Sequence, residues 1–387
     1  MKSIETSADL AINGAPPAFA ETLHVGRPNI GARATFDRYI DQIYSRNWLT
    51  NDGPLVRELE HRVAEFHQVE QCIAMANGTI ALEIAIRALD LTGEVIIPSY
   101  TFIATAHALH WQALTPVFAD IDPLTHNLDP HSVSRMITPR TSGIIGVHLW
   151  GRAAPVDELQ ALAEEHNLRL LFDAAHAFGC SYKGRSIGNF GSCEVLSFHA
   201  TKYFNTVEGG AVLTNDPELA QKMRLMRNFG FAGMDKVIHP GINGKMSEVS
   251  AAMGLVNLES IDEYRRGNEL TFRHYQEAFA NISWAALLEP PESERSNYQY
   301  VVVVVDENDA PQRDDLIRVL HAENVRARRY FWPGCHRMAP YQDLYPHAGL
   351  LLPHTEKIAR QVIVLPGGGS LRKAEIETIA RIFSVMR

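Results

Sequence analysis

Cysteine is scarce in this sequence of 387 residues, and no two cysteines lie close together along the chain. The sequence has no C-x-x-C motif of the kind found in zinc sites and thiol–disulfide enzymes. We therefore expect no metal site and four buried free thiols, at the scattered positions Cys72, Cys180, Cys193 and Cys335.

Long apolar runs and concentrated positive charge are also missing. The strongest apolar run, Val301–Val305, is far shorter than the roughly 20 residues of a membrane helix. The first residues lack the apolar segment of a signal peptide, so we expect a cytoplasmic protein without a membrane partner. The formal net charge is −9 and no block of Lys and Arg occurs, which argues against a nucleic-acid partner.

Several common catalytic motifs are absent as well. The sequence contains no G-x-x-x-x-G-K-[ST], no G-x-G-x-x-G after its first predicted strand, no H-E-x-x-H and no G-x-S-x-G. His107 and His110 have a spacing that metal ligands use on a helix, but no acidic residue or cysteine is grouped with them. We expect these two histidines to pack or to face solvent.

Short apolar runs alternate with longer amphipathic segments from about residue 54 to residue 215. This alternation is typical of βα units and predicts an α/β fold with a mainly parallel sheet. Further along, helical patterns and isolated strands such as 300–305 and 361–365 predict a smaller α+β domain. We predict a large domain over residues 1–260, including an N-terminal segment, and a small C-terminal domain over residues 261–387.

Lys202 ends the segment Ser197–Lys202, which follows a predicted strand and precedes the glycine-containing segment Glu208–Val212. A buried lysine has a lowered pKa and can attack a carbonyl as an amine. A solvated lysine in a loop is the open alternative.

Asp173 ends the apolar strand predicted over Leu170–Asp173. The carboxyl ends of parallel strands are where open α/β sheets bind ligands, and a carboxylate there can pair with the pyridinium nitrogen of a cofactor. A helix N-cap or a metal ligand is an equally simple explanation for an isolated aspartate. His176 is either a hydrogen-bonded core histidine or a donor to the phenolic oxygen of such a cofactor.

The segment Asn77–Ile80 forms a turn between a predicted strand and a predicted helix. The backbone N–H groups at the start of a helix, together with the Thr79 hydroxyl, can bind a phosphate. Ordinary N-capping would leave the same pattern. The combination of lysine, carboxylate and phosphate site predicts pyridoxal 5'-phosphate (PLP) as the cofactor.

These segments, in this order and over nearly the whole chain, resemble the DegT/StrS family of PLP-dependent sugar aminotransferases. The resemblance implies the PLP-dependent aspartate aminotransferase (type I) fold. Further segments that carry it are Asn47–Pro54, Pro98–Phe102, Asp173–Gly179, Glu208–Val212 and Gly241–Glu248.

The resemblance implies a role for each predicted site residue. Lys202 would hold the cofactor as a Schiff base and later move the proton between cofactor and substrate. Asp173 would keep the pyridine nitrogen protonated, and His176 would face the ring oxygen. Phe102 would stack on the ring.

The resemblance also implies how the phosphate is bound. Gly78, Thr79 and Ser197 would bind it from one subunit, and Asn243 of the partner subunit would reach it from the other. We therefore expect a homodimer with shared active sites.

A finer resemblance concerns the substrate. The segments Val147–Gly151 and Ala327–His336 resemble the subgroup that aminates C4 of dTDP-4-keto-6-deoxyglucose, with L-glutamate as the amino donor, to give dTDP-4-amino-4,6-dideoxyglucose. Lys202 argues against the dehydratase relatives, which carry histidine at this position. Tyr330 and His336 are candidates for lining the sugar site, although an aromatic-rich loop can equally serve packing.

Other functions stay open at this point. The chain could be a 3-aminotransferase acting on a dTDP-3-keto sugar, a UDP-sugar aminotransferase, or a PLP enzyme of another branch such as a desulfurase or an aldol-type enzyme. The absence of a cysteine on a recognisable mobile loop speaks against a desulfurase. A non-catalytic ligand sensor with the same fold is disfavoured, because binding alone would not require Lys202 together with Asp173.

Overall fold

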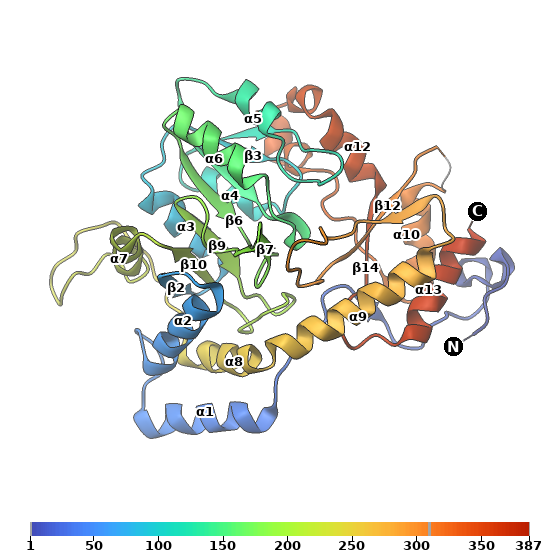
Figure 1. The fold of residues 1–387 in the computed structure, drawn as a ribbon, viewed down its shortest axis with the longest axis horizontal. Coiled ribbons are helices and arrows are strands. Elements are labelled where there is room, and N and C mark those ends of the chain that lie inside the picture. Colours follow the sequence, from blue (N-terminus) through green and yellow to red (C-terminus); the bar gives the residue numbers. More distant parts are fainter. Residues whose placement is uncertain (1, 309–310, 387) are drawn as a thin grey trace.

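A seven-stranded sheet lies at the centre of the larger part of the molecule (Figure 1). The computed structural model describes residues 2–308 and 311–386. The strand order is β2-β10-β9-β6-β5-β3-β4, and only β10 runs antiparallel to its neighbours. The mainly parallel α/β sheet predicted from the sequence is therefore confirmed. Its strands are β2 (Gln71–Met75), β3 (Glu94–Pro98), β4 (Thr115–Ala119), β5 (Thr141–Val147), β6 (Arg169–Asp173), β9 (Cys193–Ser197) and β10 (Gly210–Thr214).

Helices cover both faces of this sheet because its strands are apolar on both sides. In β2, for example, Ile73 and Met75 pack in one core, whereas Cys72 and Ala74 pack in the other. The first face is covered by α3 (Gly78–Ala88), α4 (Ala104–His110) and α7 (Pro217–Met226). The second is covered by α2 (Pro54–His67), α5 (Pro130–Met136), α6 (Val156–Glu165) and α8 (Glu248–Glu259).

One predicted helix is shorter than its sequence pattern. The sequence pattern of residues 101–111 is typical of a helix, but α4 begins only at Ala104. The preceding loop is held by a distant segment, since the Cys335 N–H donates to the Ser99 carbonyl at 2.9 Å. This long-range contact fixes the loop that leads into the site described below.

The C-terminal part is built on a three-stranded antiparallel sheet, in the order β11-β12-β14. The long helix α9 follows α8 and leads to this part (Figure 1). Its elements are α9 (Ile261–Phe279), β11 (Ala285–Leu287), β12 (Val301–Val305), α10 (Arg313–Ala322), β13 (Val325–Arg326), α12 (Pro353–Gln361), β14 (Val362–Leu365) and α13 (Lys373–Val385). Short or peripheral elements elsewhere are β1 (Leu23–His24), α1 (Arg33–Arg46), β7 (Ser181–Tyr182), β8 (Arg185–Ser186) and α11 (Tyr341–Leu344).

The N-terminal segment packs with the C-terminal part, which differs from the predicted grouping of residues 1–260. Strand β1 pairs in parallel with β13, and the buried Ile4, Leu10 and Phe19 belong to the same core as α9 and α13. The reason is apolar burial: these side chains fill a core built by residues some 300 positions later. The predicted boundary at residues 260 and 261 coincides with the start of α9 and stays a prediction.

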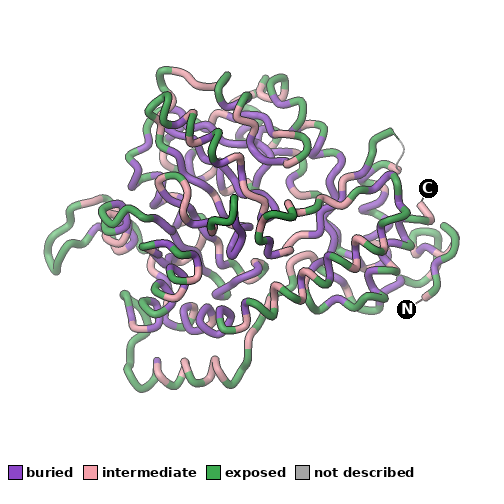
Figure 2. Tube along the Cα trace, in the orientation of Figure 1, coloured by how far each residue is buried: buried purple, intermediate pink, exposed green. Residues whose placement is uncertain are grey.

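Burial follows this architecture (Figure 2). The strands of the central sheet are mainly buried, whereas the loop that follows α7 is mostly exposed. All four cysteines are buried and free, as predicted. Within the described residues, no helix combines the length and the apolar character that crossing a bilayer requires.

Candidate active site

A pocket of about 640 Å³ opens at the carboxyl edge of the central sheet. This edge is the expected ligand site of an open parallel sheet. Strands β6 and β9 end there at Asp173 and Ser197, and β2 leads there to the start of α3. The pocket brings together most of the residues predicted from the sequence, namely Gly78, Thr79, Phe102, Asp173, His176, Ser197, Lys202 and Tyr330.

Lys202 lies in the loop after β9, and its backbone N–H donates to the His199 carbonyl at 2.8 Å. The surrounding protein removes water from the amine, and this desolvation lowers the pKa of Lys202 to about 8. The negative charge of Asp173 opposes the shift without cancelling it. The amine is therefore uncharged in a useful fraction of molecules near neutral pH, as a nucleophile toward a carbonyl must be.

The Asp173 carboxylate is held by two hydrogen bonds. The Thr105 hydroxyl donates to Oδ2 at 2.9 Å, and the Ala175 N–H donates to Oδ1 at 3.1 Å. Each oxygen keeps a further lone pair for a cationic N–H in the pocket. Thr105 lies on α4, 68 residues from Asp173 in sequence, and carries no motif that would have identified it.

His176 is held as a neutral ring with a defined hydrogen position. The Trp150 N–H donates to His176 Nδ1 at 3.3 Å, so the ring hydrogen sits on Nε2. Desolvation, helped by the positive charge of Lys202, holds the pKa of His176 well below its usual range. The ring also packs against Tyr300, with centroids 4.6 Å apart. His176 can therefore donate one hydrogen bond from Nε2 at neutral pH.

The start of α3 offers hydrogen-bond donors to an anion. The first N–H groups of a helix have no acceptor within it. The Asn77 side-chain oxygen accepts a hydrogen bond from the Ile80 N–H at 2.9 Å, and Gly78 and Thr79 line the pocket. Ser197 approaches so closely that a Cβ at position 78 would lie 2.9 Å from its Cβ. A glycine is therefore required here.

These features fit PLP. The pocket combines an amine of lowered pKa, an oriented carboxylate, a neutral histidine donor and a helix N-terminus beside a serine hydroxyl. A PLP molecule presents an aldehyde, a basic ring nitrogen, a phenolic oxygen and a phosphate, and each has a partner of suitable chemistry in this set.

His336 lies elsewhere than the sequence predicted. It is buried and does not line the pocket; its Nδ1 accepts from the Ser99 hydroxyl at 2.7 Å, and its Nε2 donates to Glu356 at 2.9 Å. Both ring nitrogens of His336 form hydrogen bonds that connect the loop before α4 with α12. We therefore assign His336 a structural role and not sugar binding.

Asn243 does not reach the pocket of its own chain. It lies exposed after α7, where it forms an isolated antiparallel bridge with Asn228. Its predicted contact with a phosphate in another subunit stays a prediction.

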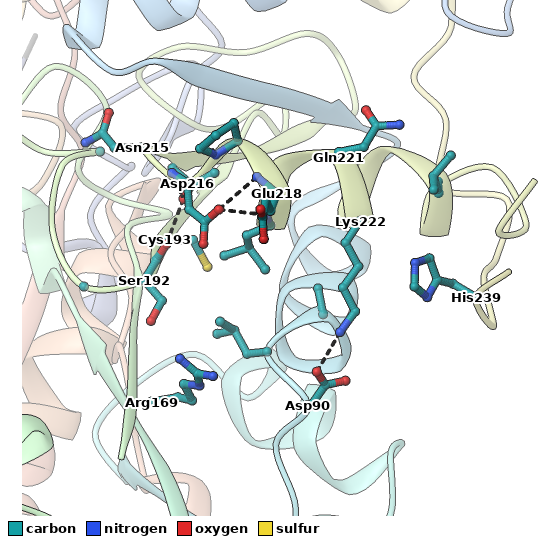
Figure 3. A pocket seen from close by; sticks show the side chains of 18 of the residues that line it. Asp90, Arg169, Ser192, Cys193, Asn215, Asp216, Glu218, Gln221, Lys222 and His239 are labelled. Atoms are coloured by element: carbon teal, nitrogen blue, oxygen red, sulfur yellow. Dashed lines mark hydrogen bonds and ion pairs between the residues drawn. The ribbon is translucent and has the colours of Figure 1, made fainter. Parts of the chain in front are cut away.

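A second pocket lies at the opposite, amino-terminal edge of the sheet (Figure 3). Arg169 and Cys193 begin β6 and β9 there, and Lys222 of α7 pairs with Asp90 at 2.7 Å. None of the predicted site residues lines it. Burial raises the pKa of the Cys193 thiol well above its usual range, which makes it a poor nucleophile. The candidate chemistry is therefore at the carboxyl edge.

Comparison with known proteins gives matches along most of the chain. The model of the DegT/DnrJ/EryC1/StrS aminotransferase family matches residues 32–384. A dTDP-4-amino-4,6-dideoxy-D-glucose transaminase of Shigella dysenteriae is 37% identical over 92% of this chain and 97% of its own length. A GDP-perosamine synthase of Caulobacter vibrioides is 35% identical over 79% of this chain and 84% of its own.

Solved structures give the same fold. The structure of DesI in the presence of its TDP-sugar product is 47% identical and has a TM-score of 0.93, covering 97% of this chain and 95% of its own. The S. venezuelae protein DesV, solved in complex with a ketimine intermediate, is 30% identical with a TM-score of 0.83 over 90% of this chain and 93% of its own.

Proposed function

Because the chain belongs to the DegT/DnrJ/EryC1/StrS aminotransferase family, we propose that it transfers an amino group from L-glutamate to C4 of dTDP-4-keto-6-deoxyglucose. The product is dTDP-4-amino-4,6-dideoxyglucose. The names of the Shigella transaminase and the TDP-sugar product of DesI support this substrate. The observation that carries the chemistry is Lys202, whose amine has a pKa of about 8 in the same pocket as Asp173 and the start of α3.

The cofactor is PLP, which when bound supplies a carbonyl for amines and a ring that withdraws electrons from the carbon losing a proton. Lys202 would hold this carbonyl through its uncharged amine. When not bound to the cofactor, the same amine would move a proton at the reacting carbon, as general base and then general acid. Its lowered pKa suits both directions near neutral pH.

The remaining residues orient the reacting groups. Asp173, fixed by Thr105, would accept a hydrogen bond from the ring nitrogen and keep it charged. His176 would donate its Nε2 hydrogen to the ring oxygen, because the Trp150 N–H occupies Nδ1. Gly78, Thr79 and Ser197 would hold the phosphate, and Phe102 would pack on the ring. Tyr330 borders the space left for the sugar.

The active form is proposed to be a homodimer in which Asn243 of one subunit completes the pocket of the other. Apolar side chains are exposed along the loop that contains it, including Phe229, Phe231, Met234 and Val237. An exposed apolar patch of this kind marks a protein interface more often than free surface.

Subunit complementation tests the shared site. Lys202→Ala and Asn243→Ala are each expected to be inactive or strongly impaired. Mixed dimers would contain one pocket with both native residues, so refolding the two variants together should restore up to about a quarter of the wild-type activity per total subunit. Monomers by light scattering, or no recovery in mixed samples that have exchanged subunits, would contradict the shared site.

The sugar assignment is tested by following the nitrogen. The purified enzyme is incubated with L-glutamate labelled at its nitrogen and dTDP-4-keto-6-deoxyglucose, and the product is analysed by mass spectrometry and NMR. Labelled nitrogen on C4 is expected. Transfer from glutamate only to a GDP- or UDP-linked keto sugar, or to C3, would refute this substrate while leaving the aminotransferase class intact.

A further inference from the structure

A third pocket, which is strongly basic, adjoins the candidate active site. We call it the arginine pocket; it has a volume of about 940 Å³ and lies between the loop before α4 and the segment that runs from α10 through β13. Four arginines line it, with Asp314 as the only carboxylate among its lining residues; they are Arg318, Arg326, Arg328 and Arg329. This concentration of positive charge occurs in a chain whose net charge is −9.

The arginine pocket borders the active site. Phe102, Tyr330 and Phe331 line both cavities. Phe102 and Phe331 lie edge to face with centroids 6.4 Å apart, and Tyr330 stacks on Phe331 at 5.1 Å. These rings therefore form the boundary between the active site and the arginine pocket.

Two of the arginines are free to bind a ligand. Arg318 pairs with Asp315, and Arg329 pairs with Asp314 at 3.2 Å. By contrast, Arg326 and Arg328 form no ion pair with any carboxylate in residues 2–308 and 311–386. The Arg328 guanidinium lies over the Tyr330 ring at 5.0 Å, at the border between the two cavities.

Both arginines are presented to solvent. Ala327 between them is buried, whereas Arg326 and Arg328 are exposed, and the Ala327 N–H donates to the Val325 carbonyl at 2.9 Å, so that the chain turns at Arg326. Arg326 is held in register by the pairing of β13 with β1, and the Arg328 backbone exchanges two hydrogen bonds with Val364 of β14. Two neighbouring guanidinium groups on a fixed backbone suit a ligand with two adjacent anionic groups.

We propose that Arg326 and Arg328 bind the diphosphate of the nucleotide-linked substrate, so that the sugar points past Tyr330 toward Lys202. This inference rests on the proposed function for the identity of the ligand. The carboxylates of L-glutamate share the negative charge of a diphosphate. However, the position of the arginine pocket beyond the aromatic rings, and its size, suit a larger ligand that extends out of the active site.

The test uses the full-length enzyme and two variants, Arg328→Gln and Arg326→Gln, with Arg381→Gln as the matched control. Arg381 is an exposed arginine of α13 that lines neither cavity. Calorimetry measures the binding of dTDP, UDP and GDP, with and without PLP. The glutamate half-reaction and the keto-sugar half-reaction are then followed separately.

Each pocket variant should weaken binding of the preferred nucleoside diphosphate roughly tenfold to 100-fold, the loss expected when a charged hydrogen bond is removed. The KM for the keto sugar should rise by a similar factor with little change in kcat. The glutamate half-reaction and the Arg381→Gln variant should match the wild type. Circular dichroism should show unchanged folding, since both arginines are exposed.

Unchanged affinity in both pocket variants would overturn the proposal, as would wild-type enzyme that binds none of the three diphosphates. A slower glutamate half-reaction at unchanged nucleotide affinity would assign the arginines to the amino donor and would also overturn it. Failure of the proposed function looks different: wild-type enzyme would bind a nucleoside diphosphate through Arg326 and Arg328 yet not aminate the dTDP-linked 4-keto sugar.

Discussion

The lowered pKa of Lys202 predicts how the cofactor-free enzyme captures PLP as the pH changes. Only an uncharged amine attacks the carbonyl of the cofactor. Desolvation in the pocket lowers the pKa from its ordinary value of 10.5 to about 8. At pH 7 the uncharged fraction is then roughly one in ten, about 300-fold more than for an exposed lysine.

The assay is stopped-flow absorbance after mixing the cofactor-free enzyme with PLP, between about pH 6 and pH 9.5 around the shifted value. The bimolecular rate should rise about tenfold per pH unit below pH 7 and level off above pH 8. A free lysine derivative measured in parallel removes the contribution of the ionisations of PLP itself. Because the charge of Asp173 raises the pKa of Lys202, Asp173→Asn should move the midpoint to lower pH.

Two results would refute this reasoning. One is a wild-type rate that continues to rise to about pH 10, as for an ordinary lysine. The other is a midpoint that moves upward in Asp173→Asn, which would mean that the charge of Asp173 does not raise the pKa of Lys202.

Three further predictions concern the same pocket. At pH 7 the charged Lys202 opposes folding, because its pKa is lower in the folded protein than in the unfolded chain. The free energy of unfolding of the cofactor-free protein should therefore rise as the pH increases from about 8 to 10.5. At pH 7, Lys202→Met should raise this free energy by about 3 kcal/mol in urea titrations. Thr105→Val should slow both half-reactions roughly tenfold, because Asp173 loses its orientation and a hydrogen bond worth about 1 kcal/mol. Thr105→Ser should restore the rate, and equal rates in the Val and Ser variants would exclude this positioning role. Gly78→Ala should weaken PLP binding at least about tenfold in equilibrium dialysis, since the added Cβ would lie 2.9 Å from the Ser197 Cβ, and unchanged affinity would remove the start of α3 from the phosphate site.

The sequence identified the parts of the site that depend on local pattern. Asp173 ends an apolar strand and Asn77 precedes a helix, and both features can be read from a few neighbouring residues. Their positions at one edge of the sheet follow from the rule that parallel strands share a carboxyl edge. Lys202 was a candidate from its position between an apolar segment and glycines, but a solvated loop lysine has the same pattern, and only the family resemblance assigned its role.

Other features depend on contacts between distant segments. Thr105 is one of several small polar residues in the region of α4, and only the folded chain shows that it donates to Asp173. His336 stands in an aromatic segment typical of a ligand site, but its imidazole forms a hydrogen bond with Ser99, 237 residues away. The docking of the N-terminal segment on β13 likewise depends on a pairing about 300 residues apart in sequence.

The most direct test of the account is an absorbance titration of the PLP-loaded enzyme through one complete cycle. L-glutamate should abolish the visible band of the lysine-bound cofactor, and dTDP-4-keto-6-deoxyglucose added afterwards should restore it. In Lys202→Ala the band should be missing from the start. If the wild-type band does not respond to glutamate, or if the same band persists in Lys202→Ala, then Lys202 is not the residue that holds the cofactor and the proposed mechanism is wrong.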